Sequence, residues 1–202
     1  MGRKLLVWLH VVSSTGWMCM ALALFVVVDH ALSAPGRRPV FEVATLLDVQ
    51  VLQFMGTTSA FSGLMLSGLT AWGYFRHWWV VAKFAITVSQ LYAGIFVLSP
   101  NLHPDGSPLL LRVGSLLMAS ALACQVWLSV AKPFPRTPWA GRTKPRTAPP
   151  WAFALCLAVP AFDYALGQAL LGVPLPALSL LVAAGYPVVR AARTEARDAV
   201  PR

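Results

Sequence analysis

Long apolar stretches alternate with short polar or charged ones along the whole chain. Six such stretches stand out, at residues 5–28, 41–73, 78–98, 109–131, 151–172 and 177–189. About 20 apolar residues in a helix cross the hydrocarbon core of a bilayer. The breaks between the stretches contain residues that end helices, such as Pro100 and Gly172. The pattern therefore predicts an all-α protein, a polytopic membrane helical bundle with six transmembrane helices.

The longest polar break divides the chain into two membrane parts. We expect residues 1–131 to form a four-helix transmembrane bundle and residues 151–190 a transmembrane hairpin. Residues 132–150 between them form a linker that is rich in basic residues and proline and has no acidic residue. Residues 191–202 form a charged tail. The predicted architecture is a four-helix core followed by a two-helix hairpin.

Composition excludes the soluble and nucleic-acid-binding classes. Hydrophobic residues make up 57% of the chain and charged residues only 11%, with a mean hydropathy of +0.66, whereas soluble domains have about 25% charged residues. The formal charge of +9 is spread over short clusters between apolar runs, so no basic face for nucleic acid is expected. Cys19, Cys124 and Cys156 lie inside apolar runs, which indicates neither a disulfide framework nor a zinc site.

The distribution of lysine and arginine predicts the orientation of the chain. If the N-terminus is cytoplasmic, twelve basic residues fall on the cytoplasmic side and three, Arg37, Arg38 and Arg112, on the other. Basic residues are enriched in cytoplasmic loops. We therefore expect a multi-pass protein of the inner (cytoplasmic) membrane of a cell, with both termini and the 132–150 linker in the cytoplasm.

Small residues mark a packing face on the second helix. Ser59, Gly63, Ser67 and Ala71 recur at every fourth position, so they form one stripe on a helix. Helices in a bilayer associate by close packing, which small residues permit. We expect the stripe of Ser59, Gly63 and Ser67 to pack against a neighbouring helix.

Polar residues from separate helices fall at a similar depth near the cytoplasmic side. His10, Lys83 and Gln125 each lie about five or six residues from that end of their helices. Polar groups inside a membrane are costly unless they are paired or hydrated, so these three are candidate ligand-binding residues of one shared site. The alternatives are that Lys83 extends to the interface, that His10 bonds a nearby serine, and that Gln125 joins two helices.

Asp163 is a fourth candidate ligand-binding residue. It lies near the middle of the predicted fifth helix, three residues after Pro160 and four before Gly167. An acid beside an interrupted helix at the membrane midplane is typical of transporters for ions or protons. The alternative is a protonated carboxyl that bonds a neighbouring helix.

Two motifs resemble a group of known membrane families. The first helix opens with LVWLHVVSSTGW, in which His10 and Trp17 share one helical face, and the third opens with HWWVVAKF. Both are similar to small bacterial membrane families allied in pattern to the copper-resistance protein CopD. The resemblance covers about the first 130 residues. It implies a helical bundle that handles a metal or a redox group. The residues that match the motifs of these families are His10, Trp17 and Lys83.

Haem and copper are therefore the candidate cofactors. A haem with two histidine ligands needs both at a similar depth, and His10 with His77 is the pair near the cytoplasmic side. These two are the candidate metal ligands. Met18, Cys19 and Met20 are soft ligands that suit Cu(I), but successive helical residues point about 100° apart and do not converge on one ion.

The sequence is compatible with three classes of function. The chain has no nucleophile elbow, phosphate loop or paired carboxylates, so we do not expect an enzyme. The first class is an accessory or assembly protein, or a binder of a small ligand, with the bilayer and a membrane protein as partners. The second is a small proton- or ion-coupled permease that uses Asp163, and the third is a haem- or copper-dependent membrane redox protein. The sequence leaves the oligomeric state open.

Overall fold

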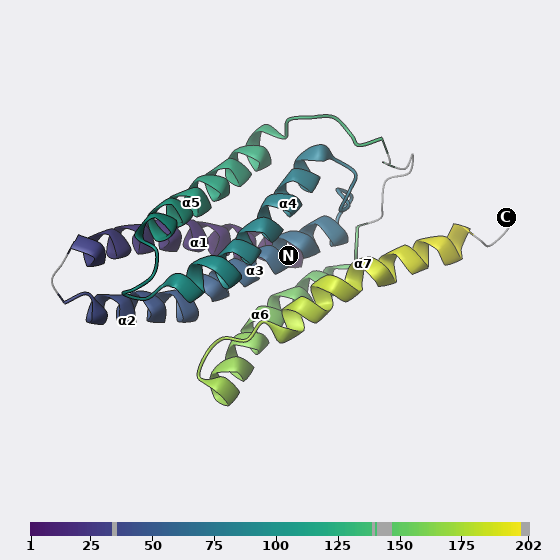
Figure 1. The fold of residues 1–202 in the computed structure, drawn as a ribbon. Helices are drawn as coiled ribbons and strands as arrows, with labels where there is room; N and C mark the ends of the chain where they lie inside the picture. Colours follow the sequence, from purple (N-terminus) through teal and green to yellow (C-terminus); the bar gives the residue numbers. More distant parts are fainter. Residues whose placement is uncertain (34–35, 139, 141–146, 199–202) are drawn as a thin grey trace.

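The computed structural model describes residues 1–33, 36–138, 140 and 147–198, and these form six continuous helices and no β-strand (Figure 1). The first is α1 (Gly2–Ser33). The second consists of α2 (Arg38–Leu47), the π-helical turn η1 (Asp48–Leu52) and α3 (Gln53–Leu69). The third consists of α4 (Trp78–Ala93), the π-helical turn η2 (Gly94–Leu98) and the 3₁₀ turn η3 (Ser99–Asn101). The last three are α5 (Pro108–Ala131), α6 (Pro150–Leu171) and α7 (Ala177–Asp198).

Five of these helices are long and apolar enough to cross a membrane, which confirms the helical class but not all six predicted spans. The sixth, α7, is apolar only over Ala177–Pro187, and the helix continues to Asp198 through most of what was predicted to be a tail. The remainder of that tail, residues 199–202, and residues 139 and 141–146 of the linker lie outside the described residues.

Helix α1 is the centre of the fold and packs against α2, α3, α5 and α6. Three clusters of buried side chains follow it from end to end. Leu24 and Val28 pack on α2, Trp17 and Ala21 pack on α5, and Leu6 packs on α3 and α6. Because these clusters share one central helix, the described residues enclose one continuous core.

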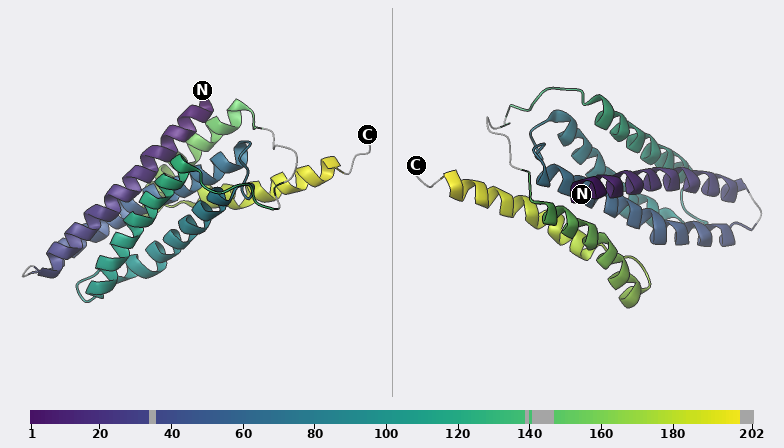
Figure 2. Two further views of the ribbon diagram at one scale, coloured as in Figure 1. Left: turned by 90° about the horizontal axis from the view of Figure 1, so that it is seen from above. Right: turned by 180° about the vertical axis from the view of Figure 1, so that it is seen from behind.

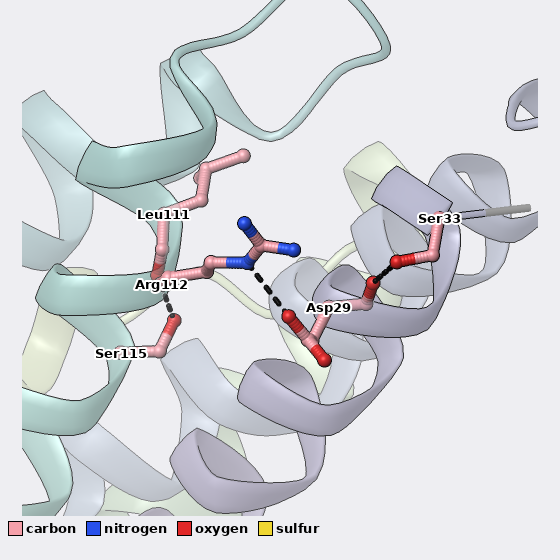
Figure 3. Close-up of polar contacts among 5 residues, drawn as sticks. All are labelled: Asp29, Ser33, Leu111, Arg112 and Ser115. Carbon is pink, nitrogen blue, oxygen red and sulfur yellow. Dashed lines mark hydrogen bonds and ion pairs between the residues drawn. The ribbon is translucent and has the colours of Figure 1, made fainter.

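Opposite ends of the bundle are closed by different contacts. At the linker end, where residues 70–77 and 132–138 lie, the amide of Thr137 donates to the carbonyl of Arg76 at 3.1 Å. At the loop end, where residues 102–107 connect two helices, Arg112 Nε of α5 donates to Asp29 Oδ1 of α1 at 2.6 Å (Figure 3). The apolar stretch predicted for the first helix ends at residue 28, but α1 continues through Asp29 to Ser33.

The hairpin of α6 and α7 lies on one side of the four-helix bundle (Figure 2). The chain leaves α6 at Leu171 and runs back along it without helical structure until α7 begins at Ala177. Gly167 permits this return, because a Cβ on it would stand 2.3 Å from the amide nitrogen of Leu175. Helix α7 therefore starts beside the middle of α6, and Tyr186 reaches Gly68 at the linker end.

Candidate functional site

His10 lies in the seam between α1 and α3. Its Nδ1 is 3.1 Å from both the carbonyl oxygen of Ser59 and the hydroxyl of Ser62. The ring packs on Gly63, since a Cβ there would stand 2.9 Å from His10 Cε1. The alternative that His10 bonds a nearby serine is met by Ser62, which lies on α3 and not on the helix of His10. His10 instead joins two helices at a position where a glycine leaves room for the ring.

Gln125 is the centre of a polar network between α4 and α5. Its Nε2 donates to Gln90 Oε1 at 2.7 Å, and its Oε1 accepts from Thr87 Oγ1 at 3.0 Å. Gln90 Nε2 donates in turn to the carbonyl of Met118 at 2.8 Å. Gln90 and Gln125 are both buried. The network thus satisfies two glutamines that would be costly in an apolar environment.

Lys83 extends this network toward the linker end. Its Nζ donates to Ser129 Oγ at 2.6 Å, and Ser129 Oγ donates to the carbonyl of Gln125 at 2.9 Å. The structure thus brings Lys83 and Gln125 into one network, whereas the hydrogen-bond partners of His10 lie on α3.

Asp163 lies away from that network and caps the first turn of α7. Its Oδ1 accepts from the amide of Leu178 at 2.9 Å and its Oδ2 from the amide of Ser179 at 2.7 Å. The side chain is buried. A helix N-terminus carries free amides and partial positive charge, so the carboxylate is stabilised by the helix that it caps.

The small-residue stripe of the second helix faces α1. Ser59 Oγ lies 2.6 Å from Ser14 Oγ, and Gly63 lies against His10. Among the described residues, Ser67 bonds within its own helix, donating to the carbonyl of Gly63 at 3.1 Å. The helix ends at Leu69, so Ala71, although four residues further on, does not continue the stripe.

His77, the second candidate metal ligand, lies in the segment that precedes α4. It forms an isolated antiparallel bridge with Arg136 of the linker, and its ring lies 5.3 Å from that of Trp72. Burial lowers the pKa of His77 below its usual range and the charges of Arg76 and Arg136 lower it further, against a hydrogen bond with the backbone of Trp72 that raises it. A neutral imidazole is therefore favoured beside these two arginines.

The arrangement of histidines, cysteines and acids does not form a metal centre within the described residues. No three of these side chains gather closely enough there to hold an ion. His10 has its Nδ1 engaged by α3, and His77 packs among tryptophans at the linker end. The two candidate metal ligands thus contact different parts of the chain, His10 the serines of α3 and His77 the rings of Trp72 and Trp79.

A polar site that the sequence analysis did not select lies near the loop end. Asp48 is buried, and its Oδ2 accepts from Ser99 Oγ at 2.6 Å and from Gln53 Nε2 at 3.3 Å. Asp48 begins η1, and Ser99 follows directly after η2. Two small cavities, of about 30 and about 20 Å³, are bordered by Asp48. The sequence signal that could have identified Asp48 is its position in an apolar run with no basic residue one turn away.

Comparisons with protein-family models, with curated proteins and with solved structures find no match to this chain.

Proposed function

We propose that this chain is a multi-pass protein of the inner membrane of a bacterium. The five apolar helices support a membrane location. Large apolar side chains also point outward along them, including Val26, Phe96, Leu117, Val130 and Leu170. A soluble protein rarely exposes such a continuous apolar surface, whereas lipid tails solvate it.

Within this setting, the geometry best supports an accessory or assembly role, with a membrane protein as partner. The observation that carries this proposal is the pairing of the polar residues near the linker end. Lys83 bonds Ser129, Gln125 bonds Gln90, and His10 bonds α3. These bonds connect neighbouring helices, which is how polar residues stabilise membrane bundles. These hydrogen bonds thus hold the helices in one arrangement, which a partner protein can recognise.

Three other functions have weaker support. A small ligand bound by His10, Lys83 and Gln125 would have to replace hydrogen bonds already made, and neither cavity at Asp48 is lined by these residues. A permease that uses Asp163 would have to break the cap of α7. A haem or copper protein of the CopD-like kind remains the third proposal, based on the resemblance of the first two motifs.

Purification in mild detergent, followed by an optical spectrum, elemental analysis and mass determination, tests the accessory role. We expect no Soret band, because His10 and His77 contact different parts of the chain. We expect less than about 0.1 copper per chain, because no three His, Cys, Asp or Glu side chains gather within the described residues. We further expect cross-linking in native membranes to yield a defined complex that contains a second membrane protein. A Soret band or one copper per chain would favour the redox function, and a chain that cross-links to no protein would contradict the accessory role.

The proposed topology gives a separate prediction, with both termini and the linker in the cytoplasm. In a variant without native cysteines, Thr147→Cys should resist an impermeant maleimide in intact cells, and Asp105→Cys should react. Both positions are exposed in the folded chain, so a difference in labelling reports the side of the membrane. Lysed cells provide the control, because both cysteines should react there. Labelling of Thr147→Cys in intact cells would contradict this topology.

A further inference from the structure

We propose that Asp48 and Ser99 form a binding site for one small monovalent cation of sodium size, which reaches the site from the loop end. The inference goes beyond the accessory role and does not depend on it. It rests on the hydrogen bonds of Asp48, on the absence of a paired cation, on two facing π-helical turns and on the cavities between them.

The carboxylate of Asp48 has one oxygen engaged and one available. Oδ2 accepts from Ser99 Oγ and from Gln53 Nε2. Among the described residues no hydrogen bond to Oδ1 is found, and Oδ1 is not one of the fully buried side-chain atoms that lack a partner, so it keeps accessible surface although Asp48 as a residue is only 6% exposed. The amide of Gln53 also donates to Ser99 Oγ at 3.3 Å, so three polar side chains converge on one point. Asp48 and Ser99 offer oxygen atoms, the ligand type that small hard cations prefer, whereas Gln53 presents its amide nitrogen to both of them as a donor.

The charge of Asp48 has no protein partner in the described part of the chain. The ion pairs found there are Arg38 with Glu42 and Arg112 with Asp29. A buried carboxylate without a cation is costly, and neutral donors offset only part of that cost. One carboxylate balances a single positive charge, whereas divalent calcium sites use several acidic oxygens. The charge at this site therefore selects a monovalent ion.

Two helices depart from α-helical geometry where they border the site. The turn η1 (Asp48–Leu52) begins at the carboxylate, and η2 (Gly94–Leu98) ends next to Ser99. Leu52 and Gly94 border both cavities. Such turns are rare and are found most often at functional sites. In transporters, interrupted helices supply backbone carbonyls to sodium or protons near their binding sites.

The size of the cavities sets the size of the ligand. They measure about 30 and about 20 Å³, and one water requires about 10–15 Å³ on the same scale. An organic molecule does not fit, whereas a bare cation with one water does. Leu102, in the loop between the third helix and α5, borders the larger cavity. The loop end is thus the nearest route into the site.

Sodium binding is tested on the full chain in detergent at fixed pH and ionic strength, with choline replaced by sodium. At a concentration about a hundred times the dissociation constant, sodium should raise the melting temperature by roughly 5 to 10 °C. Radioactive ²²Na⁺ should bind at one ion per chain. Asp48→Asn should abolish both effects, and Ser99→Ala should weaken binding about tenfold.

The control and the contrary outcomes separate this site from a general salt effect. Asp29→Asn removes an exposed carboxylate of the same loop end and should leave sodium binding unchanged. Equal stabilisation by sodium and choline, or retained ²²Na⁺ binding in Asp48→Asn, would overturn the proposal. A melting temperature that changes with pH but not with sodium would also overturn it, since Asp48 would then bind only a proton. If Asp48→Asn does not fold, stoichiometric ²²Na⁺ binding by the native chain and its roughly tenfold weakening in Ser99→Ala still decide the matter.

Discussion

Gly167→Ala should destabilise the hairpin by about 3 kcal/mol or more, at the upper end of overpacking effects. The added Cβ would stand 2.3 Å from the amide nitrogen of Leu175 and 2.5 Å from the carbonyl oxygen of Val173. Both atoms belong to the backbone, so a rotamer change cannot relieve the clash. The segment that returns along α6 must then move away, and the start of α7 must move with it. Thermal unfolding in detergent would measure the loss.

Gly185→Ala is the matched control for this prediction. It makes the same chemical change in α7, and nothing lies within 4 Å of the added Cβ. Alanine favours a helix over glycine by about 0.8–1.0 kcal/mol, so this variant should be equal to or more stable than the native chain. Equal melting temperatures for Gly167→Ala and the native chain would show that the two segments do not approach this closely.

Most helix positions could be predicted because long apolar runs and the residues that end them are both visible in the sequence. The predicted ends of the helices were less accurate, because they depend on the contacts and backbone angles of single residues. Helix α1 continues to Ser33 because Asp29, paired with Arg112, remains helical. The second helix stops at Leu69 because Thr70 is extended and Gly73 adopts a φ of +68°. Neither a pairing partner nor a backbone angle can be inferred from hydropathy alone.

The predicted sixth span differs from α7 in the structure, because composition does not show where a chain turns back. Residues after Gly172 are apolar, and that pattern suits a second full crossing. In the structure, part of this stretch runs back along α6 before α7 begins. Asp163 and Gly167, four residues apart on one face of α6, were the visible signal. The first caps α7 and the second makes room for the returning chain.

The candidate site was predicted in part, because depth can be counted along a helix but facing directions cannot. The count placed Lys83 and Gln125 at one level, and the structure joins them through Ser129. Asp48 was not among the candidates that the sequence offered. Its environment depends on η1 and η2, and π-helical turns arise from packing between helices that no local pattern in this sequence indicates.

Asp163→Ala should lower the free energy of unfolding by about 2–6 kcal/mol, because it leaves two backbone amides without an acceptor and each costs about 1–3 kcal/mol. The amide of Ser179 is bonded in a buried environment, so water does not readily replace the carboxylate there. Loss of an N-terminal cap alone accounts for about 0.5–2 kcal/mol of this effect. Thermal unfolding in detergent, with hydrogen exchange of Leu178 and Ser179, would locate the loss at the start of α7.

Asp163→Asn separates the structural role from the permease function. Asparagine retains one acceptor and introduces a donor that faces an amide, so we expect roughly half the destabilisation seen with alanine. Asp29→Ala is the control, since it removes a carboxylate from an ion pair whose side chains are 41% and 51% exposed and should cost no more than about 1 kcal/mol. If Asp163→Ala instead unfolds like the native chain while a transport activity is lost, Asp163 serves the substrate, and the cap of α7 is incidental.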